Sequence, residues 1–231
     1  MFCGAIVQGF AGFAFSAVAG AILLQFLPPG IVIPLLMLCS LAMQALILVR
    51  LRSRISWRAS IPYLAGGGAG VLLASLLFDR IEPHALRVAF GSFLVLYAGS
   101  MLLRPRAALL REAVRPVGHT AVGFAGGFVG GLTAMPGAVI AIWCDLHAMS
   151  KTTQRGTVQP FIAVMQALAL AFMFLKAPAA QDFLWWKLVI IFPALIAGTL
   201  LGLYLFGKVN EAVFRKAVIG LLLLSGLAML R

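Results

Sequence analysis

Residues 123–137 read GFAGGFVGGLTAMPG, a run with six glycines, one proline and no charged side chain. The apolar segment around this run, 119–146, would be roughly 40 Å long as a straight helix, which exceeds the roughly 30 Å hydrocarbon core of a bilayer. Proline removes a backbone hydrogen-bond donor and clashes with the preceding turn, so we expect the helix to break. The broken backbone is expected to comprise Gly130, Gly131, Pro136 and Gly137.

The first apolar segment of the chain, 1–27, has a similar composition. It holds four glycines and is followed by Pro-Pro-Gly at 28–30. It has no internal proline, and we expect its break between Ser16 and Gly20, with Gly20 in the broken backbone. No charged side chain occurs before Arg50, so this part of the chain is long enough for two membrane crossings.

The composition of the whole chain fits a membrane protein. Hydrophobic residues make up 63% of the 231 residues and charged residues only 10%, whereas an ordinary soluble domain carries about 25% charged residues. A soluble protein of this size could not bury so much apolar surface. We therefore predict an all-α integral membrane protein with about eight transmembrane segments. The apolar segments are 1–27, 31–49, 59–78, 88–103, 119–146, 157–175, 184–206 and 215–230.

The net charge of +12 comes from basic residues in short connectors between the apolar segments. Four arginines lie at 50–58 and four at 104–115, and they form no continuous stripe of the kind that binds nucleic acid. Two apolar segments separate these connectors, so both lie on one face, which the positive-inside rule makes cytoplasmic. The N-terminus lacks the pattern of a cleaved signal peptide, and the three cysteines have no metal-binding spacing.

The chain reads as an internal duplication. Gly-Phe-Ala-Gly occurs at 9–12 and 123–126, and Met-Gln-Ala-Leu occurs at 43–46 and 165–168. The offset grows from 114 to 122, so eight residues are inserted, and we assign the insertion to 147–156. From these matches we predict two homologous four-segment repeats joined by a basic cytoplasmic linker. The predicted bounds are 1–104, 105–118 and 119–231.

The two repeats could run parallel or inverted. If every apolar segment crosses once, the repeats are parallel and eleven of the eighteen basic residues lie inside. If the first segment of each repeat folds back on itself, the repeats are inverted and thirteen lie inside. The charges therefore favour inversion. In transporters built from such repeats, the substrate site lies at the repeat interface.

These features resemble the sulfite exporter TauE/SafE family of membrane transporters. The residues that carry the resemblance are the Gly-rich runs 9–13 and 123–131, each followed by its half-segment. A short second segment with proline near its end and a four-segment unit repeated once add to it, and together they cover essentially the whole chain. The resemblance implies transport of small anions, including sulfite, sulfonates and organic acids, and is compatible with proton coupling.

Polar residues inside the apolar segments are the candidate substrate contacts. The N-terminus of a half-helix after a break carries a partial positive charge, and two such ends would bind an anion. Polar side chains in membrane helices face the bundle interior; alternatively, they only link neighbouring helices or close broken turns. Gln44 and Gln166 occupy equivalent repeat positions. The full set of candidates is Gln8, Ser16, Gln44, Thr133, Trp143, Arg155, Gln159 and Gln166.

Arg155 is the first choice for a charged contact, because a guanidinium matches the oxygen geometry of a carboxylate or sulfonate. Alternatively, it is a flanking arginine that reaches the lipid headgroups. Asp145 and His147 are the candidates for proton coupling, since histidine titrates near neutral pH; the alternative places both in the solvated interface. Trp143 could line the site or belong to the interfacial aromatic belt.

These observations predict a secondary transporter that exports small anions by alternating access. No P-loop occurs, so direct driving by ATP is not encoded in this chain. No HExxH or GxSxG motif occurs either, so we expect no enzyme activity. A channel or a non-transporting membrane scaffold is the alternative. We expect a small anion and the lipid bilayer as partners, and no nucleic acid, cofactor or metal. The expected location is the cell membrane, specifically a bacterial inner membrane, and the oligomeric state stays open, with a homodimer as one option.

Overall fold

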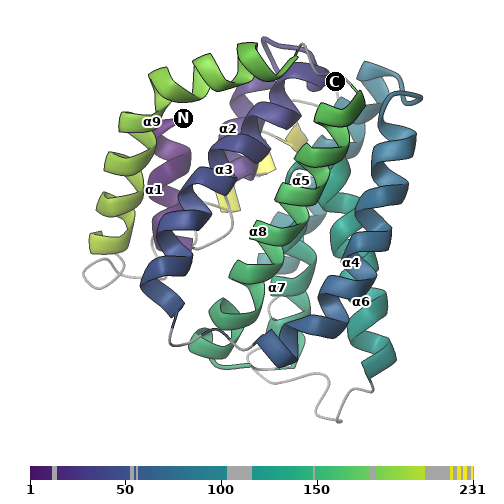
Figure 1. The fold of residues 1–231 in the computed structure, drawn as a ribbon, viewed down its shortest axis with the longest axis vertical. Helices are drawn as coiled ribbons and strands as arrows, with labels where there is room; N and C mark the ends of the chain where they lie inside the picture. The colour runs from purple at the N-terminus through teal and green to yellow at the C-terminus, as the bar shows by residue number, and fades with distance from the viewer. Residues whose placement is uncertain are drawn as a thin grey trace.

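The computed structural model of the chain is all-helical in the part that it describes. That part comprises residues 1–11, 15–52, 55, 57–102, 116–147, 149–176, 180–205, 219–220, 223–224, 226–227 and 230. The helices assigned there are α1 (Phe2–Ala11), α2 (Phe15–Leu23), α3 (Pro29–Leu51), α4 (Trp57–Phe78), α5 (Pro83–Leu102), α6 (Pro116–Thr133), α7 (Pro136–Leu146), α8 (Lys151–Lys176) and α9 (Ala180–Leu205) (Figure 1). The predicted all-α class is confirmed for these residues.

Local sequence explains where the helices begin. Ser150 caps α8, because its Oγ accepts the N–H of Thr153 at 3.2 Å. Several other helices begin at a proline, where the missing N–H would have had no partner and the fixed φ already suits a helix. These prolines are Pro29 of α3, Pro83 of α5, Pro116 of α6 and Pro136 of α7.

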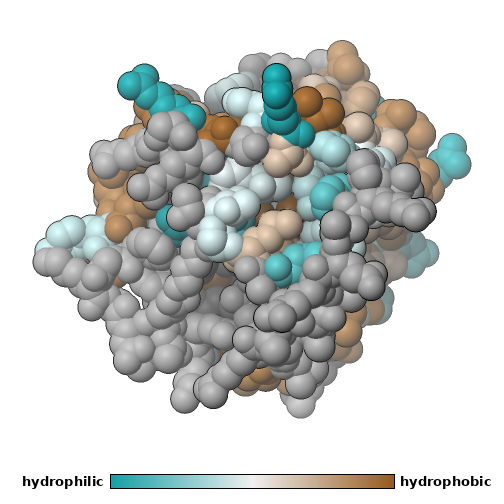
Figure 2. All heavy atoms as spheres, turned by 90° about the horizontal axis from the view of Figure 1, so that it is seen from below, coloured by the Kyte–Doolittle hydropathy of each residue, from teal (hydrophilic) through white to brown (hydrophobic). Residues whose placement is uncertain are grey.

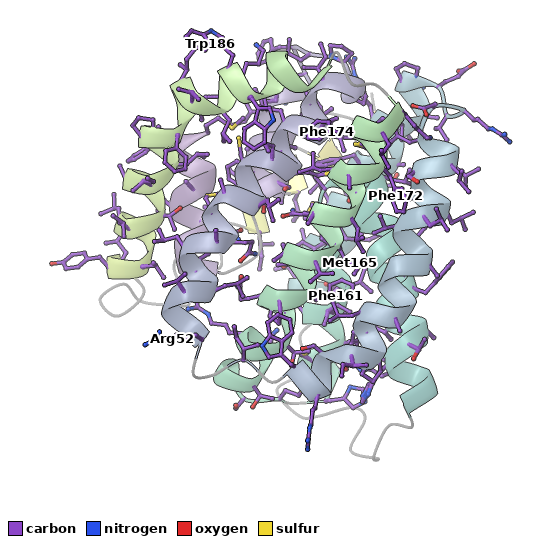
Figure 3. The ribbon with its side chains drawn as sticks, viewed as in Figure 1. Arg52, Phe161, Met165, Phe172, Phe174 and Trp186 are labelled. Atoms are coloured by element: carbon purple, nitrogen blue, oxygen red, sulfur yellow. The ribbon has the colours of Figure 1, made fainter. Side chains whose placement is uncertain are left out.

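The long helices run between two ends of a bundle, which we call the Arg52 end and the Trp186 end after the residues labelled there (Figure 3). Helices α3 and α9 run toward the Arg52 end, and α4 and α8 run away from it (Figure 1). Seen from the Arg52 end, hydrophilic residues gather on the end face and hydrophobic ones show along the flanks (Figure 2). This distribution fits a bundle whose flanks face lipid.

Among the residues that the structure describes, four helices are long and apolar enough to cross a membrane. Each contains one internal proline, which membrane helices tolerate because neighbouring helices and polar side chains re-satisfy the freed backbone groups. Helix α9 is the most exposed of the four, as expected of a helix that meets lipid rather than protein. The four spans are Pro29–Val49, Trp57–Phe78, Thr153–Lys176 and Trp185–Leu205.

The first apolar segment folds back on itself. Helix α1 ends at Ala11 and α2 begins at Phe15. A Cβ atom added to Gly4 would lie 3.2 Å from the Cβ of Ala19, whereas these two residues would be about 22 Å apart in one straight helix. Helices α1 and α2 are therefore an antiparallel hairpin.

The prediction of a break between Ser16 and Gly20 is wrong. Both residues lie inside α2, and the chain reverses between Ala11 and Phe15. A Cβ atom at Gly20 would lie 2.6 Å from the ring of Phe90 in α5. Gly20 therefore permits close helix packing, a role that glycine plays in membrane helices as readily as it marks a break.

The second broken segment, α6 and α7, is a hairpin of the same kind. A Cβ atom at Gly126 in α6 would lie 3.1 Å from the carbonyl oxygen of Pro136, the first residue of α7. Between the helices, Ala134 has a φ of 57°, the left-handed region that residues with a side chain adopt rarely. The chain thus breaks directly before the predicted Pro136 and Gly137, while Gly130 and Gly131 lie in the last turn of α6.

The hairpins show where the second half of the chain is longer than the first. Helices α2 and α3 are joined by residues 24–28, and α7 and α8 by residues 147–150. The insertion that we assigned to 147–156 is therefore not there. Gly-Phe-Ala-Gly at 123–126 lies well inside α6, whereas its copy at 9–12 begins in the last turn of α1. The extra residues lengthen α6 between this tetrapeptide and the break.

Glycines bring two pairs of helices into backbone contact, and we call these contacts the glycine seams. Helix α4 lies on α6, where a side chain at Gly66 would overlap the carbonyl oxygen of Thr120. Helix α9 lies on α1, where a side chain at Gly202 would overlap the carbonyl oxygen of Ile6. Such contacts let membrane helices associate without a hydrophobic driving force. The seams also contain Gly9, Gly70, Gly123, Gly127 and Gly198.

The two hairpins and the two seams enclose a central pair of helices, α3 and α8, which pack against each other. Helix α3 also contacts α2 and α9, and α8 also contacts α4 and α7. The largest fully buried side chains come from these helices and their neighbours, and they include Phe161 and Met165 of α8 (Figure 3).

Two predicted segments fall largely outside the described residues. The predicted linker at 105–118 is described only from Pro116, which already belongs to α6. Of the predicted last segment, 215–230, the described residues include Ile219, which is buried, and Gly226, which packs against Gly91 of α5.

We predict that Gly66→Ala destabilises the protein. Its Cβ would overlap the Thr120 carbonyl oxygen, and overpacking of this kind typically costs about 1–3 kcal/mol. Thermal unfolding in detergent measures the effect. Gly68→Ala is the matched control, because no atom lies within 4 Å of its Cβ position, and it should leave the midpoint unchanged or raise it through helix propensity. Equal midpoints for the two variants would contradict backbone contact at this seam.

Candidate functional site

A glutamine side chain bonds the backbone at the break of the first hairpin. Gln8 of α1 is 1% exposed, and its Oε1 accepts the backbone N–H of Phe15, the first residue of α2, at 3.1 Å. The first N–H groups of a helix have no partner within the helix, and inside a bilayer they cannot turn to water. Gln8 thus satisfies one of the backbone groups that the break leaves free, and Ser16, the next residue of α2 after Phe15, is also buried.

At the break of the second hairpin, polar side chains from two helices bond backbone carbonyl oxygens. The Thr133 hydroxyl donates to the carbonyl oxygen of Val129, one turn earlier in α6, at 2.7 Å. The Gln166 amide of α8 reaches across and donates to the carbonyl oxygen of Ala134, the residue with positive φ, at 3.3 Å. Gln166 therefore holds the break in place from outside the hairpin.

Gln44 and Gln166 occupy matching places in α3 and α8. Each is the sixteenth residue of its helix, and both are buried. Among the described residues, neither amide atom of Gln44 has a hydrogen-bond partner, and the same holds for Oε1 of Gln166. An unpaired buried amide group costs about 1–3 kcal/mol. Such groups mark a place where water or a ligand completes the hydrogen bonding.

In the part of the chain that the structure describes, every buried polar side chain is uncharged. Amides and hydroxyls can donate hydrogen bonds to an anion, and the N-termini of α2 and α7 add partial positive charge. The interior therefore offers donors and helix dipoles rather than fixed charges. The buried polar residues are Gln8, Ser16, Ser40, Gln44, Ser60, Ser75, Thr133, Thr157, Gln159, Gln166 and Thr199.

Arg155 lies apart from the hairpin breaks, in the second turn of α8 at the Arg52 end, and its side chain is only partly buried. It precedes Gln166 by eleven residues, about 16 Å of helix rise. Gln159, one turn further into the bundle than Arg155, is buried. The neighbouring Gln154 donates to the carbonyl oxygen of Ala141 at 3.1 Å and so ties the start of α8 to α7.

Trp143 lies seven residues into α7 from Pro136, about 10 Å of helix rise from the break. It belongs to an aromatic cluster with His147, whose ring centroid lies 4.4 Å away, and with His119 of α6 at 6.5 Å. Tyr63 of α4 stacks on His119 at 4.8 Å. The cluster joins three helices near the Arg52 end.

The candidates for proton coupling lie at this cluster rather than at the breaks. His147 follows the last residue of α7, and its Nδ1 lies 2.9 Å from the carbonyl oxygen of Trp143. Asp145 is a helical residue of α7, and its side chain lies outside the described part of the structure.

Some residues of this region carried no signal in the sequence. His119 and Tyr63 lie on separate helices, so no spacing links them to Trp143. Thr199 of α9 is fully buried, and its hydroxyl has no partner among the described residues. To predict its burial on the seam with Gly9, one would have had to know that α9 packs on α1. The described residues contain no group of three or more His, Cys, Asp or Glu side chains that could hold a metal ion.

A helical bundle with several membrane-spanning helices, two folded-back hairpins and an interior of uncharged hydrogen-bonding groups defines a multi-pass membrane protein of the transporter class. The family model for the sulfite exporter TauE/SafE matches residues 1–229. The chain therefore belongs to the TauE/SafE family, and the resemblance found in the sequence is confirmed. Comparison with curated proteins and with solved structures found no match.

Gln166 and Gln44 should respond differently to truncation. Gln166→Leu leaves the Ala134 carbonyl oxygen unpaired, and we expect a loss of about 1–3 kcal/mol in the free energy of unfolding. Gln44→Leu removes an amide with no described partner, so stability should be unchanged or higher. Thermal midpoints in detergent compare the two. A midpoint that falls as far in Gln44→Leu as in Gln166→Leu would make Gln44 a structural residue.

Proposed function

We propose that the protein is a secondary transporter that exports small anions, such as sulfite, organosulfonates or organic acids, across the cell membrane, specifically a bacterial inner membrane. Membership of the TauE/SafE family supports a transport function of this kind. The substrate would bind between the two hairpins and be exposed to each side of the membrane in turn, as in other transporters with broken helices.

The observation that carries the proposal is the buried, unpaired amide of Gln44 on α3, the central helix that packs against α2 of the first hairpin and against α8. Gln44 has two donors and an acceptor with no partner among the described residues. The N-termini of α2 and α7 each supply partial positive charge equivalent to roughly half an elementary charge. Together these groups form the kind of site that binds an anion without a buried cation.

The pattern of helix contacts supports two inverted repeats, of residues 1–104 and 119–231. Each half would contribute a hairpin, a central helix and a long outer helix: α1–α2, α3 and α4 in one, and α6–α7, α8 and α9 in the other. The seam of α4 with α6 then has its counterpart in the seam of α9 with α1. The central helices α3 and α8 run in opposite directions (Figure 1), which parallel repeats would not produce.

The proposed orientation places the Arg52 end in the cytoplasm. The connectors rich in arginine, 50–58 and 103–115, join helices whose described ends lie at the Arg52 end (Figure 1). The connector 147–150 lies there too, followed by Lys151 and Arg155. Cytoplasmic connectors of membrane proteins carry an excess of such residues.

Coupling to protons would be carried by His147, with Asp145 as the second candidate. Histidine changes charge close to neutral pH, and the aromatic cluster ties His147 to α4 and α6 as well as to its own hairpin. A charge change there would act on the contacts between helices of both proposed repeats.

The alternatives are an anion channel and a non-transporting scaffold. A channel would need a continuous polar lining, whereas the described interior carries hydrophobic residues around isolated amides. A non-transporting scaffold would have no use for an unpaired amide inside the bundle, since such a group costs stability. Counterflow separates a carrier from a channel, because only a carrier exchanges labelled for unlabelled anion against a gradient.

Anion flux into proteoliposomes tests the proposal. We expect saturable uptake of at least one of sulfite, sulfoacetate and a dicarboxylate, with a response to a proton gradient, and loss of most of this uptake in Gln44→Leu. Gln25→Leu is the control, because Gln25 bonds the carbonyl oxygen of Ala21 near the Trp186 end, away from the hairpin breaks. Absence of flux for all three anions in folded protein would refute the proposed substrate class.

A further inference from the structure

Three polar residues of α8 form a stripe along one face of the helix. Arg155, Gln159 and Gln166 follow one another at intervals of four and seven residues. At 100° per residue these intervals place them within about 40° of one another around the helix axis. Gln159 and Gln166 are buried, and Arg155 is partly exposed at the Arg52 end. The stripe therefore runs from the end of the bundle to the second hairpin break.

Gln44 of α3 lies at the same depth in the bundle as the middle of this stripe. It is seven residues from the end of α3, about 10 Å of helix rise from the Arg52 end. Gln159 is eight residues from the start of α8, about 12 Å from the same end. Because α3 and α8 pack against each other in opposite directions, these two amides lie at a similar depth.

The matching face of α3 is apolar at Ile33 and Met37, in the part nearest the Trp186 end. The sixteenth residues of the two helices, Gln44 and Gln166, define an offset of 122 residues. By this offset, Arg155 corresponds to Ile33 and Gln159 to Met37, and both of these side chains are completely buried. The stripe on α8 opens toward the Arg52 end, whereas its counterpart on α3, toward the Trp186 end, is closed by hydrophobic side chains.

From this asymmetry we propose that Arg155 is the first anion contact on a one-sided entry route along α8, which passes Gln159 at the depth of Gln44 and ends at Gln166, while Ile33 and Met37 form the barrier on the other side. The inference rests on the proposed function, since it concerns the route to the same site. It assigns Arg155 to recruitment at the Arg52 end and leaves the deep site to uncharged groups.

The chemistry of the stripe suits a small oxyanion. A guanidinium pairs with a carboxylate or sulfonate through two parallel N–H···O bonds, and its charge concentrates anions at the mouth of the route. A deeper arginine would hold the anion too firmly to release it, whereas the amides further along offer neutral donors. An anion would therefore exchange a strong contact near water for several weaker contacts at depth.

Cysteine labelling measures the route without requiring transport. In a background with the native cysteines replaced by alanine, Gln159→Cys is exposed from each side of the membrane to two water-soluble methanethiosulfonates, one carrying a sulfonate and one a trimethylammonium group. We expect labelling from the Arg52 side, with the anionic reagent favoured. Adding Arg155→Gln should lower the rate of labelling by the anionic reagent about tenfold, because one charge-assisted contact is lost. The rate of labelling by the cationic reagent should stay unchanged or rise.

Three controls make the result specific. Arg58→Gln removes one exposed positive charge at the same end, outside the stripe, and should leave the ratio of the two rates unchanged. Arg155→Lys keeps the charge but loses the paired donors, so its anionic labelling rate should lie between the rates with arginine and with glutamine at this position. Met37→Cys, the counterpart of Gln159→Cys, should resist labelling from the Trp186 side.

The outcomes separate this inference from the proposed function. Three results would each overturn the inference even if anion flux is present. The first is a ratio of anionic to cationic labelling rates that Arg155→Gln leaves unchanged. The others are no labelling of Gln159→Cys from the Arg52 side, and fast labelling of Met37→Cys from the Trp186 side. The expected labelling pattern in a protein that moves no anion would leave the route intact and refute the transport proposal alone.

Discussion

The structure depends on the satisfaction of backbone groups at two breaks inside a bilayer. Where α1 gives way to α2 and α6 to α7, peptide N–H and C=O groups lose their helical partners, and lipid offers none. Gln8 supplies the missing acceptor at the first break, and Gln166 supplies a donor at the second. The hairpins, the central helices and the buried polar interior follow from this requirement, because only polar side chains from the protein can meet it.

In the proposed site, the same amides would connect stability with binding. Gln166 is committed to the backbone by one end of its amide and leaves the other end unpaired, while Gln44 leaves both ends unpaired. A residue of this kind lowers stability in the empty protein and regains the lost hydrogen bonds when a ligand arrives. If the proposed anion binds there, the cost of the buried amide is also a source of affinity, and the uncharged surroundings would keep that affinity moderate.

Much of this architecture could be predicted from the sequence. The long uncharged runs predicted membrane helices, and Pro136 with Gly137 predicted the second break within a residue or two. The first break was misplaced at Ser16–Gly20, since a glycine that admits Phe90 looks the same in the sequence as one that ends a helix. The cluster of Tyr63, His119 and Trp143 left no pattern, because its members come from three helices whose packing is a tertiary property.

The glycine seams have a consequence for how the chain is made. Helix α1 is synthesised well before α9, yet its glycine face fits α9, from which about 170 residues separate it. The first hairpin must therefore remain in the membrane without this partner until α9 has emerged from the ribosome. Contacts between such distant parts of a chain form late and slowly. During synthesis the first hairpin would depend on insertion machinery to shield it, and each half made alone would lack the surface that completes it.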